Sequence, residues 1–176
     1  MIIARRRALT MGGSVFAALA APAILRAAPL QVVKMQGSAR GERVWFNPLG
    51  VAIPADSTVR FVNHDPGNGH TATAYHPDNF DRVRRIPQAA APWDSDFLLP
   101  DESFEVTFTV PGVYDYYCIP HEMAAMVGRI VVGTPLDTGW EGPSTDTTDV
   151  SPEVLATLPT VEEIHARGRI EQKDGA

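Results

Sequence analysis

The chain has 176 residues, of which 44% are hydrophobic, and this is enough for one domain with a sizeable core. Its 21 acidic residues against 15 basic ones give a formal net charge of −6, so nucleic acid is not an expected partner. An acidic composition either keeps an exported protein soluble or steers it toward a basic partner.

Residues 1–28 have the organisation of an export signal. Three arginines at 5–7 precede an apolar stretch over 15–25 and small residues near a possible cleavage point. The arginines resemble the twin-arginine type of bacterial signal. A membrane anchor needs roughly 20 apolar residues, whereas this run is shorter and is interrupted by Pro22. We therefore expect an exported, periplasmic protein without stable membrane insertion, whose formal charge after signal removal is −10.

Residues 29–133 are predicted to form β-strands. Segments rich in Val, Phe, Thr and Tyr are separated by Pro, Gly, Asn and Asp; they are LQVVKM, RVWFN, STVRFVN, HTATAY, SFEVTFTV, VYDYYC and VGRIVV. Apolar and polar residues alternate in STVRFVN and SFEVTFTV, which is typical of strands with one buried face. Because no helical pattern lies between these segments, we predict an all-β domain, an antiparallel sandwich with Greek-key connections.

One connection, over 78–101, is long for a compact domain and contains Trp93. A loop of this length is usually functional or carries a short helix. The alternative is a solvent-exposed loop without a function of its own, in which Trp93 packs on the edge of the sandwich.

Residues 134–176 are predicted to form a polar linker and a short helical tail. Ser151 followed by Pro152 is typical of a helix start, and Thr160 with Glu163 forms a capping-box pattern. We expect this tail to wrap the sandwich or to mediate oligomer contacts.

The segment CIPHEMAAM concentrates potential metal ligands. It holds the only cysteine in the sequence, Cys118, followed by His121 and Met126. An unpaired thiol in an exported chain is open to oxidation unless something occupies it. Sulfur and imidazole together favour copper, and a zinc site would be expected to contain more Cys or His and no thioether. His70 is the best candidate for a fourth ligand, because the strand predicted to begin there places it at a sheet end.

The segment YDYYCIPHEMAAMVGRIVV, together with FNPLGVAIPADSTVRFVNHD and GNGHTATAY, resembles the plastocyanin and pseudoazurin branch of the cupredoxins. The resemblance covers about residues 30–133 and implies a Greek-key β-sandwich with one type 1 copper ion, Cu(I) or Cu(II). It implies the ligands His70, Cys118, His121 and Met126. An asparagine that usually follows the first histidine and joins the two ligand loops is replaced by Thr71, whose hydroxyl can do part of that work.

The expected function is the transport of single electrons between redox partners. A metal whose four positions are filled by protein has no open position for a substrate, so we do not expect an enzyme. By resemblance, His121 with its neighbour Pro120 forms the electron-transfer surface. Tyr117 is assigned to the same surface, as a second exit for electrons through its covalent link to Cys118. A cytochrome or another oxidoreductase is the expected partner, through a small and weak interface. Copper delivery or storage is the alternative function.

Other residues compete for roles at the site. Met123 is a rival axial ligand, although it follows His121 by only two residues. We expect His64 to be a solvated loop residue and His165 to be exposed on the tail. His76 would lie about 20 Å from His70 along a strand, too far to share its metal. The tyrosines of YDYY are expected in the core.

Overall fold

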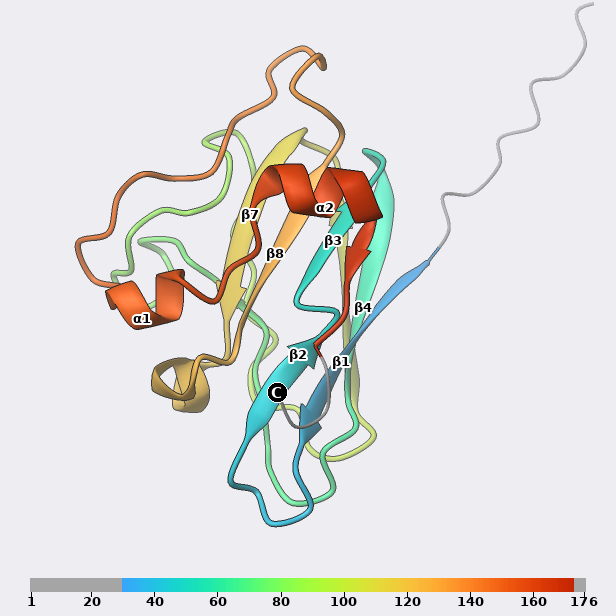
Figure 1. Ribbon diagram of the computed structural model, residues 1–176, viewed down its shortest axis with the longest axis vertical. Helices are drawn as coiled ribbons and strands as arrows, with labels where there is room; N and C mark the ends of the chain where they lie inside the picture. The colour runs from blue at the N-terminus through green and yellow to red at the C-terminus, as the bar shows by residue number, and fades with distance from the viewer. Residues whose placement is uncertain (1–29, 173–176) are drawn as a thin grey trace, which may run out of the picture.

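The protein folds as two β-sheets packed face to face, and the computed structural model describes residues 30–172 (Figure 1). The first sheet, of order β2-β1-β4-β6, consists of β1 (Gln31–Gly37), β2 (Val44–Asn47), β4 (Ser57–Asn63) and β6 (Ser103–Phe108). The second, of order β5-β7-β8-β3-β9, consists of β5 (Thr73–Ala74), β7 (Gly112–Tyr117), β8 (Val127–Val132), β3 (Gly50–Ile53) and β9 (Arg169–Ile170). The predicted all-β sandwich is confirmed, while the predicted export signal lies outside the described residues.

Strand β4 illustrates how the sequence pattern builds the core. Its residues alternate between buried and half-buried, and Val59 and Phe61 are fully inside. They pair in antiparallel register with Val106 and Phe104 of β6. These two β6 side chains stay half-buried because β6 is an edge strand. The alternation predicted for both strands is confirmed.

Two strand pairs are parallel, which corrects the expectation of an antiparallel sandwich. β1 runs parallel to β4, and β3 runs parallel to β8. Alternation along a strand indicates which face is buried and says nothing about the direction of the neighbouring strand. The predicted strand HTATAY is also shorter than expected, because only its centre pairs with β7 while His70 forms a single bridge to Leu98. The seven predicted strands do not include β3 or β9.

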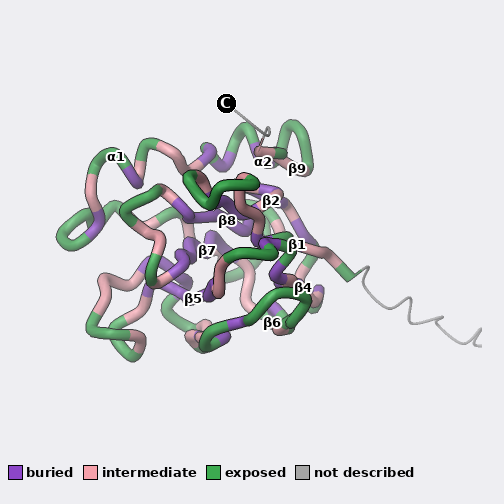
Figure 2. The backbone as a smooth tube through the Cα atoms, turned by 90° about the horizontal axis from the view of Figure 1, so that it is seen from below, coloured by how far each residue is buried: buried purple, intermediate pink, exposed green. Residues whose placement is uncertain are grey.

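The C-terminal tail covers the outer face of the second sheet. Ile164 of α2 (Val161–Arg167) clusters with Val113 of β7 and Val131 of β8. A shorter helix, α1 (Pro152–Leu155), lies near the 3₁₀ helix η1 (Ile119–Ala124) at the end of this sheet, and β9 pairs with β3 at the sheet edge (Figure 1). Every residue of β7 and β8 is therefore buried, as the central strands of Figure 2 show.

The predicted helix caps are present in this tail. The Ser151 hydroxyl accepts a hydrogen bond from the Val154 amide, and Thr160 and Glu163 form the capping box. Within residues 30–172, no helix is long and apolar enough to cross a membrane.

The long connection over 78–101 packs on the sandwich and contains no regular helix. Trp93 is 8% exposed and meets Phe108 edge-on, with ring centroids 5.3 Å apart. The ion pair of Arg84 with Glu141 attaches this loop to the tail, and the two segments run along the same side of the sandwich in Figure 1. The loop is thus part of the packed structure.

A buried ion triad joins the second sheet to the loop and the tail. Asp115 of β7 is fully buried and accepts hydrogen bonds from Arg129 of β8 at 2.7 Å and from Arg85 of the loop at 3.0 Å. Arg129 also donates to the Pro159 carbonyl, and Arg85 donates to the Asp146 carbonyl. One carboxylate therefore holds three segments together.

Candidate metal centre

The candidate ligands of the C-terminal loop lie on a tight connection between β7 and β8. This connection is the 3₁₀ helix η1 (Ile119–Ala124), which begins after Cys118. The amide of Cys118 donates to the Met126 carbonyl at 3.0 Å, and the Met126 amide donates to the His121 carbonyl at 3.2 Å. Ala125 adopts the left-handed conformation that ends the turn. These contacts bring the backbones of three candidate ligands together.

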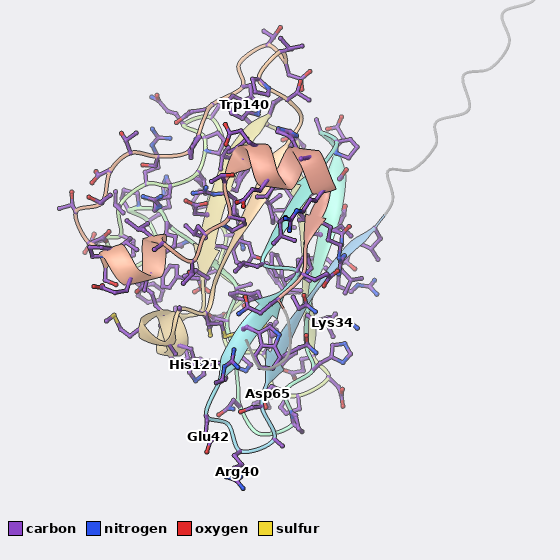
Figure 3. All side chains as sticks on the ribbon, in the orientation of Figure 1. Lys34, Arg40, Glu42, Asp65, His121 and Trp140 are labelled. Atoms are coloured by element: carbon purple, nitrogen blue, oxygen red, sulfur yellow. The ribbon has the colours of Figure 1, made fainter. Side chains whose placement is uncertain are left out.

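Three donor atoms from two segments converge at this end of the sandwich. The Nδ1 atoms of His70 and His121 are 3.1 Å apart, and Cys118 Sγ lies 3.6 Å and 3.4 Å from them. In Figure 3, His121 lies at the end of the molecule opposite Trp140. Among residues 30–172, these three side chains form a group whose donor atoms all lie within 4.8 Å of one another. Such a cluster is shaped for one small metal ion.

The Cys118 thiol is fully buried and accepts a hydrogen bond from the Thr71 amide at 3.3 Å. Burial raises the pKa of Cys118 to about 11, although hydrogen bonds from Thr71 oppose the shift. The copper-free protein therefore holds a neutral thiol near pH 7, and a bound metal must displace its proton.

Burial lowers the pKa of both histidines from their ordinary value. For His70 the hydrogen bond with Asp65 opposes the shift, and for His121 the nearby His70 adds to it. Both rings are consequently neutral near pH 7, and a neutral imidazole is the form that ligates metals.

Met126 and Met123 differ sharply in their surroundings. Met126 is fully buried beside Cys118, whereas Met123 is 81% exposed. A thioether in solvent cannot also point into the buried donor cluster, so the geometry favours Met126 as the fourth donor. Thiolate, two imidazoles and a thioether form the donor set of a blue-copper site.

Comparison with known proteins identifies the family of this chain as one that binds copper. The family model "Copper binding proteins, plastocyanin/azurin family" matches residues 33–133. The chain belongs to this family. It is 37% identical over 131 residues to the plastocyanin of a Synechococcus strain, covering 70% of this chain and 86% of that one. Identity to the chloroplast plastocyanin of Physcomitrium patens is 32% over 127 residues, or 70% of each chain.

Solved structures of related proteins are also similar to this chain. Pseudoazurin from Methylobacterium extorquens AM1 has 27% identity and a TM-score of 0.47, covering 62% of this chain and 79% of that one. Membership of the copper-binding family, together with the converging donors, confirms the expected cofactor, one copper ion. The residues present fit that ion, with sulfur and imidazole donors already gathered.

The cupredoxin ties its two ligand segments together through Thr71. The Thr71 hydroxyl accepts hydrogen bonds from the Ile119 amide and from the Thr73 hydroxyl, both at 2.9 Å. Its backbone amide binds Cys118 Sγ, as described above. Thr71 therefore joins the segment of His70 to the loop of Cys118, the role suggested for its hydroxyl from the sequence.

Asp65 is a residue near the candidate ligands that the sequence did not predict. Asp65 is 1% exposed, and its Oδ2 atom lies 3.0 Å from His70 Nε2. Burial opposes ionisation, but hydrogen bonds from Asn68, the Gly67 amide and His70 outweigh it and lower the pKa of Asp65. The motif NHDPGNGH reads as a turn, and no sequence signal marks one aspartate in a turn as the partner of a histidine ligand.

Tyr117 is not part of the surface, which corrects its assignment as an exposed exit for electrons. It is 2% exposed and stacks on Tyr75 with ring centroids 4.4 Å apart. The Arg82 guanidinium lies 4.8 Å from the Tyr117 ring centroid and pairs with Glu122 and Asp149. The long loop and the tail therefore cover the tyrosine side of Cys118, a cover that the sequence did not reveal.

The remaining predicted positions agree with the structure. His64 and His165 are exposed and His76 is half-buried, and none of them belongs to the donor cluster found within residues 30–172. His121 is half-buried and its neighbour Pro120 is exposed. The three neighbouring tyrosines of β7 are at most 2% exposed, in agreement with their expected place in the core.

Proposed function

We propose that this cupredoxin carries single electrons outside the cytoplasm through a copper ion bound by His70, Cys118, His121 and Met126. The observation that supports the proposal most directly is the convergence of Cys118 Sγ with the Nδ1 atoms of both histidines. When bound, the copper ion supplies the one-electron couple between Cu(I) and Cu(II).

The protein holds the donor atoms in fixed positions, so the surroundings of the copper ion can stay the same while its charge changes. Cys118 is held by the Thr71 amide, and the loop of His121 is closed by backbone hydrogen bonds to Cys118 and Met126. Donors fixed by such contacts need to move little when the metal gains or loses an electron. Four donors from the protein also leave no position for a substrate, which favours a carrier over an enzyme.

The proposed electron-transfer surface is the exposed rim of His121 with Pro120. Met123 and Ala124 are exposed beside them, so this rim is apolar around a partly accessible imidazole. A small apolar contact suits a redox partner that must leave quickly, because small interfaces bind weakly. We propose a soluble redox protein, such as a cytochrome, as the partner.

Periplasmic location is proposed from the organisation of residues 1–28. The arginine cluster and the apolar stretch are typical of an export signal. An oxidising compartment is compatible with the lone thiol, since Cys118 is buried and a bound metal would occupy it.

The visible absorption spectrum during titration with Cu(II) tests the proposed function. We expect an intense blue colour that saturates at about one copper per chain and is bleached by ascorbate. Met126→Ala should change the spectrum, whereas the matched variant Met123→Ala should not, because Met123 is 81% exposed. A colourless or rapidly exchanging copper complex would contradict electron transport and favour copper delivery or storage.

A further inference from the structure

We propose that Asp65 is a positioning residue of the copper centre, which orients the ring of His70 and favours Cu(II) over Cu(I). This inference rests on the proposed function, because it concerns a proposed copper ligand. In Figure 3, Asp65 lies at the same end of the molecule as His121. It contributes no atom to the donor cluster and acts through His70.

The two nitrogens of His70 have different partners. Nδ1 faces Cys118 Sγ and His121 Nδ1, and it needs a free lone pair to bind a metal. The proton of the neutral ring then lies on Nε2, which donates to Asp65 Oδ2 at 3.0 Å. A carboxylate only accepts hydrogen bonds. Asp65 therefore selects the tautomer of His70 that presents Nδ1 to the metal.

The Asp65 carboxylate is itself held in place by its loop. Its Oδ1 atom accepts a hydrogen bond from the Gly67 amide, and its Oδ2 atom accepts one from the Asn68 side chain, both at 2.9 Å. The Asp65 amide donates to Asn63 Oδ1, and Asn63 Nδ2 in turn donates to the Leu98 carbonyl. A carboxylate that accepts several hydrogen bonds is favoured in its charged form.

The opposite side of the carboxylate is shaped by β1. A Cβ atom at Gly37 would lie 2.0 Å from Asp65 Oδ2, far inside contact distance. Only glycine leaves room for the carboxylate at this point of the strand. Strand β1 and the loop thus form a buried site for one negatively charged carboxylate next to the ring of His70.

The negative charge has a predictable effect on the metal. A carboxylate that accepts the second N–H of a ligating histidine raises the basicity of that ligand. The buried carboxylate also attracts Cu(II) more strongly than Cu(I), because Coulomb attraction scales with charge and is weakly screened inside the protein. Asp65 should therefore lower the reduction potential.

The test compares Asp65→Asn with Asp56→Asn in the copper-loaded protein. Both variants lose one negative charge, but Asp56 is exposed in the turn that precedes β4, at the far end of that strand from Asn63. We expect Asp65→Asn to weaken Cu(II) binding about 10–100-fold, with a smaller loss for Cu(I). Each tenfold difference between the two losses raises the one-electron potential by about 59 mV. A potential that moves no further than in Asp56→Asn would overturn the inference.

Nitrogen-15 NMR of the copper-free protein provides a readout that does not depend on copper or on the variant folding. We expect His70 in the unsubstituted chain to be the Nε2–H tautomer with a slowly exchanging ring proton. An Nδ1–H tautomer would overturn the inference. Failure of the unsubstituted chain to form a blue complex would instead contradict the proposed function, so the two failures can be told apart.

Discussion

Replacement of Asp115 by asparagine should cause a large loss of stability at a site remote from the metal chemistry. The fully buried Asp115 carboxylate accepts two hydrogen bonds from Arg129, at 2.7 Å and 3.0 Å, and one from Arg85 at 3.0 Å. Both arginines are themselves at most 8% exposed. In Asp115→Asn the neutral amide would leave two buried cations without a counter-charge, which typically costs about 3–5 kcal/mol.

Thermal unfolding of the copper-free protein measures this loss, because bound copper would add its own stabilisation. At about 2–4 °C per kcal/mol for a domain of this size, the midpoint should fall by about 6–20 °C. The matched control is Glu105→Gln, which breaks the Arg60 pair whose side chains are 44% and 47% exposed. Such exposed pairs are worth less than about 1 kcal/mol. Equal midpoints for the two variants would refute the importance of the buried triad.

Further predictions concern the thiol, the loop and the tie between the ligand segments. Burial raises the pKa of Cys118 from 9.0 to about 11, so the thiol ionises more readily in the unfolded chain and the folded state should lose stability between pH 9 and pH 11. The expected loss in the free energy of unfolding is about 2–3 kcal/mol, and Cys118→Ser should not show it. Urea midpoints of the copper-free protein at both pH values measure this loss. Trp93→Ala should cost about 3–5 kcal/mol in urea unfolding, because it empties a buried ring site against Phe108. Thr71→Ala should lower the free energy of unfolding by about 1–3 kcal/mol, because the Ile119 amide loses its hydrogen-bond partner, and hydrogen exchange at that amide should become faster.

Each of these three predictions has a contrary result. If Cys118→Ser lost as much stability between pH 9 and pH 11 as the parent, the loss would come from the buried tyrosines, whose pKa values are also raised by burial. A Trp93→Ala variant within about 1 kcal/mol of the parent would mean that the loop is not part of the core. Thr71→Ser keeps the hydroxyl and should restore Ile119 protection; if it does not, the methyl group and not the hydrogen bond is responsible.

The sequence was most informative where several signals lie close together. Cys118, His121 and Met126 share one nine-residue segment, and a soft donor set of this kind has few interpretations. His70 followed from its place at a strand end, although the strand there is shorter than expected. Strand alternation predicted the buried faces because burial of apolar side chains is a local property of each residue.

The features that the sequence did not reveal depend on distant segments. Asp65 acquires its role from His70 and from Gly37, which lies 28 positions earlier in the chain. Asp115 alternates with apolar residues like an exposed strand position, but the tail buries it with Arg129. Tyr117 is covered by a loop and a tail whose course no local pattern predicts. The alternation of apolar and polar residues along a strand does not show which distant segments of the chain pair with each other.

The last strand within the described residues, β9, covers the edge of β3 at one end of the second sheet. β9 pairs with β3, and the Leu49 and Ala52 amides donate to the carbonyls of Ile170 and Gly168 at 2.8 Å. A chain that stopped before Gly168 would present these donors to solvent as an open template for strands of other molecules. The two-residue β9 therefore replaces the four-residue β3 as the edge strand, and so short an edge is a poorer template for edge-to-edge association between copies of the protein.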